Sequence, residues 1–294
     1  MFGPFRLKVV RRPDSIRDTP GEVAMTRIPV LVRGVGDVGS AVAHRLFSDG
    51  YAVVIHDSPE PVATRRKMAF AEAVFDGVAR LDGVEARRAM DVDMVKALMA
   101  GNTVAVFVGP FPDLLEAIKP DVLIDARMRK RAVPEIQRGS APLTIGLGPN
   151  FEAGVTCDVA IETSWDALGT VIRAGTPRPL AGQPRALGGH ARDRYVYAPC
   201  EGVFRTRAEI GDRVDQGQPI ATIGETVLVA PVAGVLRGLT HDGVPVIARA
   251  KVIEVDPRAR TAEVAGISER PRRIAAGVAD AVRQFVGRNL AKGR

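Results

Sequence analysis

The stretch VLVRGVGDVGSAVAHRL, residues 30–46, decides the fold that we expect of this chain. It places Gly34-x-Gly36-x-x-Gly39 at the end of a predicted strand and the start of a predicted helix. In such a loop the first glycine permits a tight turn, the second lets the backbone approach a phosphate, and the third lets the helix lie close to the strand. The helix offers unpaired N–H groups to an anion. The motif therefore predicts a loop that binds a dinucleotide.

The next predicted strand supports this interpretation. It reads AVVIHD and ends in Asp57, where a carboxylate can accept hydrogen bonds from a ribose diol. The charge of Asp57 would repel a 2′-phosphate, so NAD or another adenine nucleotide is favoured over NADP. A similar fold whose loop binds nothing is the alternative.

Beyond this unit, short apolar runs alternate with helical patterns. Runs rich in β-branched residues that alternate with helices are typical of a parallel sheet covered on both faces. We therefore expect an α/β domain with a doubly wound, Rossmann-like parallel sheet. Its strands are predicted at residues 28–32, 52–55, 104–108, 121–124, 143–147 and 159–161, and its helices near 38–48, 60–75, 91–100 and 112–118.

Residues that follow strands are the next candidates, because ligands of open α/β sheets bind outside the carboxyl ends of the strands. Asp125 and Arg127 hold such a position. Arginine can grip a phosphate with two hydrogen bonds, and a neighbouring carboxylate can orient it or accept a ligand hydroxyl. An ion pair that only anchors a loop is an equal alternative. The predicted cofactor-binding residues are Gly34, Gly36, Asp37, Gly39, Asp57, Asp125 and Arg127, and no catalytic residue is assigned.

The second half of the chain contains an internal repeat. Ala198-Pro199-x-x-Gly202-Val203 recurs 32 positions later as Ala230-Pro231-x-x-Gly234-Val235. Two similar all-β halves predict a small pseudo-symmetric barrel. Its Gly-Asp-x-Val-x-x-Gly-Gln turn resembles that of biotinyl and lipoyl domains. The hairpin between the halves, residues 223–227, contains no lysine, so we expect neither biotin nor lipoate.

These patterns divide the chain into five parts. We expect a flexible arm over residues 1–27, a Rossmann-like nucleotide-binding domain over 28–172, a linker over 173–194, a lipoyl-like barrel-sandwich domain over 195–257 and a C-terminal helical tail over 258–294.

Composition excludes several classes of protein. The 41 basic and 34 acidic residues give a net charge of +7, but the excess lies near the chain ends and aromatics make up only 5%, so we expect no nucleic-acid binding. No run approaches the roughly 18 apolar residues of a membrane span, and no secretory signal is evident, so we expect a cytoplasmic protein without membrane association. Two cysteines and four histidines show no metal-ligand spacing, so no metal is predicted.

Two further features have open interpretations. Arg65 and Arg66 stand early in a predicted helix, against its dipole, which indicates an anionic partner or simply a solvated helix face. Cys157 precedes a strand and is either a thiolate that accepts sulfur or selenium, or a small apolar side chain.

The motifs at residues 33–37, 65–77, 119–128 and 141–155, together with the lysine-less barrel, resemble proteins of the selenium-dependent molybdenum hydroxylase system. The chain departs from that pattern at Asp37-Val38-Gly39-Ser40, and again where a more basic stretch is replaced by residues 163–169.

The resemblance implies an accessory or maturation protein for a xanthine-dehydrogenase-like molybdenum hydroxylase, which binds a dinucleotide or a molybdopterin nucleotide. Its partners would be that hydroxylase or its cofactor-assembly proteins, and we also expect a homo-oligomer. The alternatives are an NAD-dependent oxidoreductase and a non-catalytic nucleotide-binding scaffold that docks through its barrel.

Overall fold

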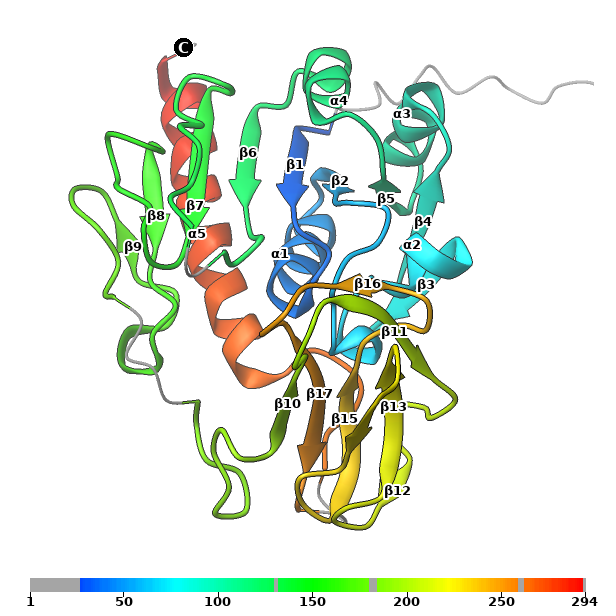
Figure 1. The fold of residues 1–294 in the computed structure, drawn as a ribbon. Helices are drawn as coiled ribbons and strands as arrows, with labels where there is room; N and C mark the ends of the chain where they lie inside the picture. The colour runs from blue at the N-terminus through cyan, green and yellow to red at the C-terminus, as the bar shows by residue number, and fades with distance from the viewer. Residues whose placement is uncertain (1–26, 130–131, 180–183, 259–261, 293–294) are drawn as a thin grey trace, which may run out of the picture.

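The computed structural model describes residues 27–129, 132–179, 184–258 and 262–292. It contains a nine-stranded sheet with helices and two four-stranded antiparallel sheets, which lie beyond the carboxyl ends of the central strands of the large sheet (Figure 1). The predicted N-terminal arm lies, apart from Arg27, outside the described residues.

The large sheet has the strand order β3-β4-β5-β2-β1-β6-β7-β8-β9. The strands from β4 to β8 in this order run parallel, whereas the edge strands β3 and β9 are antiparallel to their neighbours. The strands are β1 Pro29–Arg33, β2 Ala52–His56, β3 Val78–Leu81, β4 Val84–Ala89, β5 Val104–Phe107, β6 Val122–Asp125, β7 Leu143–Leu147, β8 Val159–Ile161 and β9 Val171–Ile172.

Both faces of the central strands are buried. Val30 and Val32 of β1 belong to the core that contains α1 and α5, whereas Leu31 belongs to the core that contains α3 and α4. Successive side chains of a strand point to opposite faces, so β1, β2, β5 and β6 are apolar on both faces except at Arg33, His56 and Asp125, which end three of them. The helices are α1 Asp37–Ser48, α2 Glu72–Asp76, α3 Val92–Ala100, α4 Phe111–Ile118 and α5 Glu269–Lys292, with 3-10 turns η1 Arg66–Met68 and η2 Trp165–Ala167.

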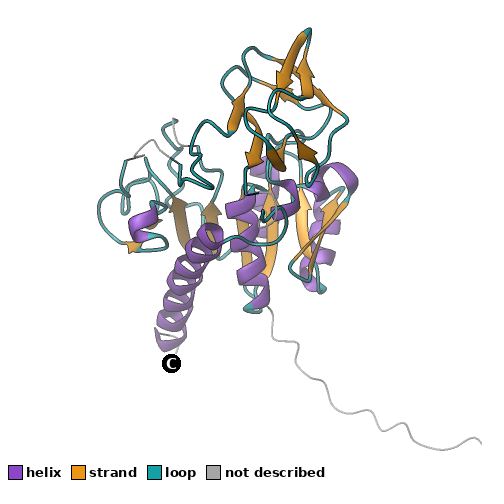
Figure 2. Ribbon diagram, turned by 90° about the horizontal axis from the view of Figure 1, so that it is seen from below, coloured by secondary structure: helices purple, strands orange, loops and turns teal. Residues whose placement is uncertain are grey.

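The predicted doubly wound parallel sheet is wrong, because the observed sheet is mixed. The turn at Asp82 and Gly83, with φ of 43° and 85°, reverses the chain between β3 and β4 and adds an antiparallel edge. The described parts of the connections from β6 to β7 and from β7 to β8 contain no helix. One face of β7 and β8 is instead covered by α5, which comes from the C-terminal end of the chain (Figure 2). This helix lies so close that a Cβ on Gly277 would be 1.9 Å from the carbonyl oxygen of Gly169.

The second half forms two sheets, with the orders β10-β17-β15-β12 and β14-β13-β11-β16, around one core. The strands are β10 Tyr195–Tyr197, β11 Gly202–Thr206, β12 Arg213–Val214, β13 Pro219–Ile223, β14 Thr226–Val229, β15 Gly234–Leu239, β16 Pro245–Val246 and β17 Lys251–Asp256. The repeat maps β11 onto β15, β12 onto β16 and β13 onto β17. The predicted barrel-sandwich is wrong, because the strands form two separate antiparallel sheets. Each half contributes a short strand to the sheet of the other half: β12 pairs with β15, and β16 pairs with β11.

The segment from Thr64 to Lys67 attaches this second half to the large sheet. The N–H of Leu239 donates to the carbonyl of Thr64 at 2.8 Å, and Arg66 Nε returns a hydrogen bond to the carbonyl of Leu239 at 2.8 Å. Lys67 Nζ donates to the carbonyl of Ile210 at 2.7 Å. The single helix predicted over residues 60–75 is wrong, because the structure has only η1 and α2 in this segment.

Within the described ranges, none of the helices combines the length and the apolar character needed to cross a membrane.

Candidate functional site

The glycine loop between β1 and α1 contains two kinds of glycine. Gly34 has a φ of 109°, and a Cβ there would lie 2.9 Å from the backbone of Ala126. A Cβ on Gly39 would lie 1.9 Å from the carbonyl oxygen of Gly34. Gly36, in contrast, has φ −63° and ψ 178°, which any residue can adopt, and a Cβ there would meet nothing within 4 Å. The fold thus requires Gly34 and Gly39, but not Gly36.

The first turn of α1 is not capped by a side chain. Its N-cap is Gly36, which has no side chain to accept hydrogen bonds from the first turn. The first N–H groups of a helix have no partner inside the helix, and they carry the positive end of its dipole. Asp37 Oδ1 accepts one of them, from Val38 at 3.0 Å. The remaining donors make this end of α1 suited to an anion.

Asp57, the predicted ribose acceptor, holds the glycine loop in place. Its Oδ2 accepts the N–H of Val35 at 2.7 Å, and its Oδ1 accepts the N–H of Ser58 at 2.7 Å. A carboxylate offers about four acceptor positions, so these contacts leave Asp57 able to accept a ligand hydroxyl.

A second group of charges lies at the end of β6, beside the loop. Asp125 is 2% exposed and accepts hydrogen bonds from Arg127 Nε at 3.1 Å and from the side-chain amide of Gln137. Burial alone would raise the pKa of Asp125, but the hydrogen bonds and the charge of Arg127 lower it. Arg127 and Arg129 also form ion pairs with Glu135. Asp125 is therefore ionised and held by more than a surface ion pair.

Arg33 completes this group, because the register of β1 and β6 places it beside Asp125. Its guanidinium lies 3.9 Å from the centre of the Phe111 ring and 3.9 Å from Glu135. Its Nε–H is buried and has no acceptor within the described residues. Arg33 thus joins Asp125, Arg127, Arg129 and Glu135 in one group of charges, the edge cluster.

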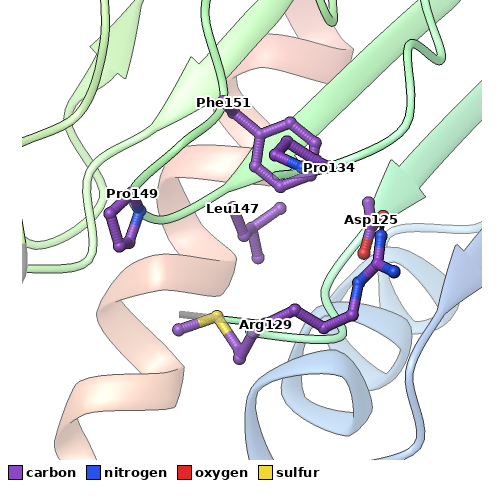
Figure 3. A pocket seen from close by; sticks show the side chains of 7 residues that line it. Asp125, Arg129, Pro134, Leu147, Pro149 and Phe151 are labelled. Atoms are coloured by element: carbon purple, nitrogen blue, oxygen red, sulfur yellow. Dashed lines mark ion pairs between the residues drawn. The ribbon is translucent and has the colours of Figure 1, made fainter. Parts of the chain in front are cut away.

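Side chains fill most of the crevice next to the edge cluster. The cavity that remains has a volume of about 10 Å³, room for about one water molecule. Its lining is shown in Figure 3, where the side chain of Arg129 extends toward Asp125; the lining residues are Asp125, Met128, Arg129, Pro134, Leu147, Pro149 and Phe151. A ligand larger than water would have to displace side chains here, and Arg129, 35% exposed, is the most free to move.

A third group of charges lies where β17 meets α1. Glu254 is fully buried and accepts hydrogen bonds from Arg65 at 3.0 Å, Arg194 at 2.7 Å, Arg237 at 3.0 Å and Lys251 at 2.9 Å. Burial would raise the pKa of Glu254, but the surrounding charges, Lys251 and Arg65 foremost, hold it well below its ordinary value.

Arg65 connects this group to the glycine loop. Its Nη1 donates to Asp37 Oδ2 at 2.8 Å, while its Nε and Nη2 donate to Glu254. These two carboxylates raise the pKa of Arg65 against the effect of burial. The two carboxylates and the cations around them form the junction cluster: Asp37, Arg65, Arg194, Arg237, Lys251 and Glu254.

The structure places every predicted cofactor-binding residue at one end of the sheet. They follow the carboxyl ends of β1, β2 and β6, and β1 and β6 are neighbours. Whether they bind a cofactor stays a prediction.

Sequence reasoning missed Arg33, Arg194, Arg237 and Glu254, and weighed Lys251 only as a carrier lysine. One signal was present: Glu254 stands between the apolar residues Ile253 and Val255 of the predicted barrel, and a buried carboxylate requires cationic partners.

Neither cysteine gains support as a reactive group. Cys157 is 1% exposed, and burial raises the pKa of its thiol to about 11, so the thiol stays protonated near neutral pH. Cys200 is exposed. Within the described ranges there is no group of three or more His, Cys, Asp or Glu side chains that could hold a metal ion.

Comparison with known proteins gives one relative by sequence. No family model matches the chain. The uncharacterized protein YqeB of Escherichia coli (strain K12) is 38% identical over 256 residues, which cover 86% of this chain and 47% of YqeB. The chain therefore spans about half the length of the curated relative that it matches.

Comparison with solved structures gives weak matches. A succinylglutamate desuccinylase/aspartoacylase from Rhodobacter sphaeroides is 17% identical, with a TM-score of 0.24, over 78% of this chain and 85% of that one. An aspartoacylase family protein from Mesorhizobium loti is 11% identical, with a TM-score of 0.24 and the same coverage. The product-bound ectoine utilization protein EutE (DoeB) from Ruegeria pomeroyi is 12% identical, with a TM-score of 0.23 and, again, the same coverage. At these TM-scores the likeness carries no argument about the fold or chemistry of the chain.

These comparisons correct the predicted family. The prediction of membership in the selenium-dependent molybdenum hydroxylase system is contradicted, because no family model matches the chain and its relative YqeB carries no such description. The predicted role as a maturation protein for a molybdenum hydroxylase, and its alternatives as an NAD-dependent oxidoreductase or a docking scaffold, are corrected together with the family.

Proposed function

We propose that this chain binds a phosphate-bearing ligand, such as an adenine nucleotide, at the carboxyl ends of β1, β2 and β6. The observation that carries the proposal is Gly36. The fold does not require a glycine there, since a Cβ would meet nothing within 4 Å, and Gly36 directly precedes the first turn of α1. A close approach by phosphate oxygens is a physical reason for leaving this position bare.

The charges around the loop support the same ligand class. Arg33 and Arg127 lie at the neighbouring strand ends, and a buried N–H of Arg33 has no acceptor in the described part of the chain. Guanidinium groups bind phosphate oxygens with geometry that lysine cannot match. Asp57 can accept a ribose hydroxyl while it continues to hold Val35. The arrangement therefore suits a nucleotide better than a bare carboxylate.

The test is titration calorimetry with ATP, NAD, CTP and inorganic pyrophosphate, on the wild type and on Gly36→Val. We expect the wild type to bind at least one of them and Gly36→Val to lose that binding. The backbone at Gly36 permits valine, so the variant should keep the wild-type melting temperature.

The matched control is Gly287→Val, which adds the same side chain at an exposed position of α5 where a Cβ would meet nothing within 4 Å. It should bind like the wild type. No binding of any of the four compounds to the wild type, or unchanged binding by Gly36→Val, would overturn the proposal.

A further inference from the structure

The junction cluster contains more positive than negative charge. Arg65, Arg194, Arg237 and Lys251 face only two carboxylates, Asp37 and Glu254. Unbalanced charge away from water is costly unless a partner compensates it.

Arg270 adds to the excess. Its guanidinium donates to the carbonyl of Thr163, at 3.0 Å from Nη2, and its charge is close enough to Asp37 to lower the pKa of that carboxyl. Its own pKa is lowered, first by burial.

The acidic groups at the border of the cluster do not neutralise it. The carboxylate of Glu162 is taken up by three backbone N–H groups. Asp256 forms its own ion pair with Arg258 at 2.7 Å. The positive excess therefore remains with the residues that face Asp37 and Glu254.

A buried donor in the cluster is also unpaired. Arg194 is 2% exposed; its Nη1 donates to Glu254 and its Nη2 to the hydroxyl of Tyr195 at 2.7 Å. Its Nε–H is buried with no acceptor among the described residues. Buried polar groups in native proteins are almost always paired, so this donor is a second sign of a missing acceptor.

Two members of the cluster can be reached from solvent. The side chains of Arg65 and Lys251 are 19% and 29% exposed, and both donate to the same oxygen of Glu254, at 3.0 and 2.9 Å. Arg65 also contacts Asp37, the residue next to Gly36. Glu254 and Arg65 thus connect Lys251 to the open end of α1. Its positive charge comes from the second half of the chain.

We propose that the junction cluster is a second anion subsite, so that the ligand is a polyanion of the diphosphate class: one phosphate at the Gly36 end of α1 and the next on Lys251 and Arg65. This inference rests on the proposed function and deepens it, because the second half of the chain then completes the site. Asp37 does not oppose the ligand, since Arg65 neutralises it.

The test compares inorganic pyrophosphate with inorganic phosphate by calorimetry, which removes any contribution from a base or ribose. The wild type should bind pyrophosphate at least about tenfold more tightly than phosphate, and Lys251→Gln should lose about tenfold in pyrophosphate affinity, the loss of one charge-assisted hydrogen bond. Phosphate binding by Lys251→Gln should stay near the wild-type value.

Two variants keep the result interpretable. Lys96→Gln makes the same change at a half-exposed position of α3 and should leave pyrophosphate binding unchanged. Lys251→Arg should restore it, which a purely structural role in folding would not predict. Equal affinity of the wild type for the two anions, or unchanged pyrophosphate binding by Lys251→Gln, overturns the second subsite. If the second subsite is overturned in this way but Gly36→Val still abolishes ligand binding, the proposed function itself stands.

Discussion

The edge cluster and the junction cluster each surround a buried carboxylate with arginines at the same end of the large sheet. Four of the five members of the edge cluster lie between residues 125 and 135, and Glu135 at its rim is 55% exposed. The junction cluster draws on residues from 37 to 254, and its central Glu254 is fully buried. Water can therefore compensate the loss of a partner at Glu135, but not at Glu254.

This difference predicts unequal costs when one charge is removed. A buried charge that loses its partner pays the full desolvation penalty, whereas an exposed one is screened. Substitutions of the carboxylates should therefore rank in the order Glu254, Asp125 and then the rim pairs.

The largest effect is expected for Glu254→Gln. It leaves four cationic side chains facing one another without the carboxylate charge that they share. We expect the free energy of unfolding to fall by about 3–5 kcal/mol, measured by urea denaturation. The control Glu225→Gln, at an exposed hairpin in the same half of the chain, should change it little.

Acid provides a check on the same group. The pKa of Glu254 is depressed in the folded state, so its stabilising effect is complete above the unfolded value near 4.5 and is lost as pH falls toward the folded pKa. The wild type should lose stability in that range more steeply than Glu254→Gln. Equal slopes in the two proteins would contradict the assigned role.

An intermediate effect is expected for Asp125→Asn. The amide keeps the shape of the carboxyl but removes the charge that Arg127 contacts, while Glu135 still neutralises part of the positive charge. We expect a loss of about 2–3 kcal/mol in urea denaturation. Asp93→Asn, at a side chain that is 96% exposed, is the matched control. A loss as large as that of Glu254→Gln would remove the contrast between the clusters.

The smallest effect is expected for Arg129→Ala. Its side chain is 35% exposed and its partner Glu135 is 55% exposed, so the pair should contribute no more than about 1 kcal/mol. Thermal denaturation should place this variant close to the wild type. A loss of several kcal/mol would mean that the rim is as tightly coupled as the junction.

Much of the candidate site was predictable from the sequence because its members follow strands that run parallel. Gly34 and Asp125 stand at the ends of apolar runs, and the carboxyl ends of parallel strands meet at one edge. Arg65, for which the sequence left an anionic partner and a solvated helix face open, forms ion pairs with Asp37 and Glu254 of the same chain. The mixed sheet was not predicted, since the β3–β4 hairpin is too short and polar to stand out from the helical patterns around it.

By itself the sequence determined the local units: the apolar strands, the strained turn at Gly34, the close contact at Gly39 and the repeat in which β15 is the equivalent of β11. Each depends on steric or hydrophobic effects between residues near in the chain or on a fixed period. Only the tertiary structure decided that α5 covers β7 and β8, and that Arg65, Arg194, Arg237 and Lys251 meet at Glu254. Charges attract through space regardless of their separation in sequence, so no local pattern encodes which of the many arginines meet at one buried carboxylate.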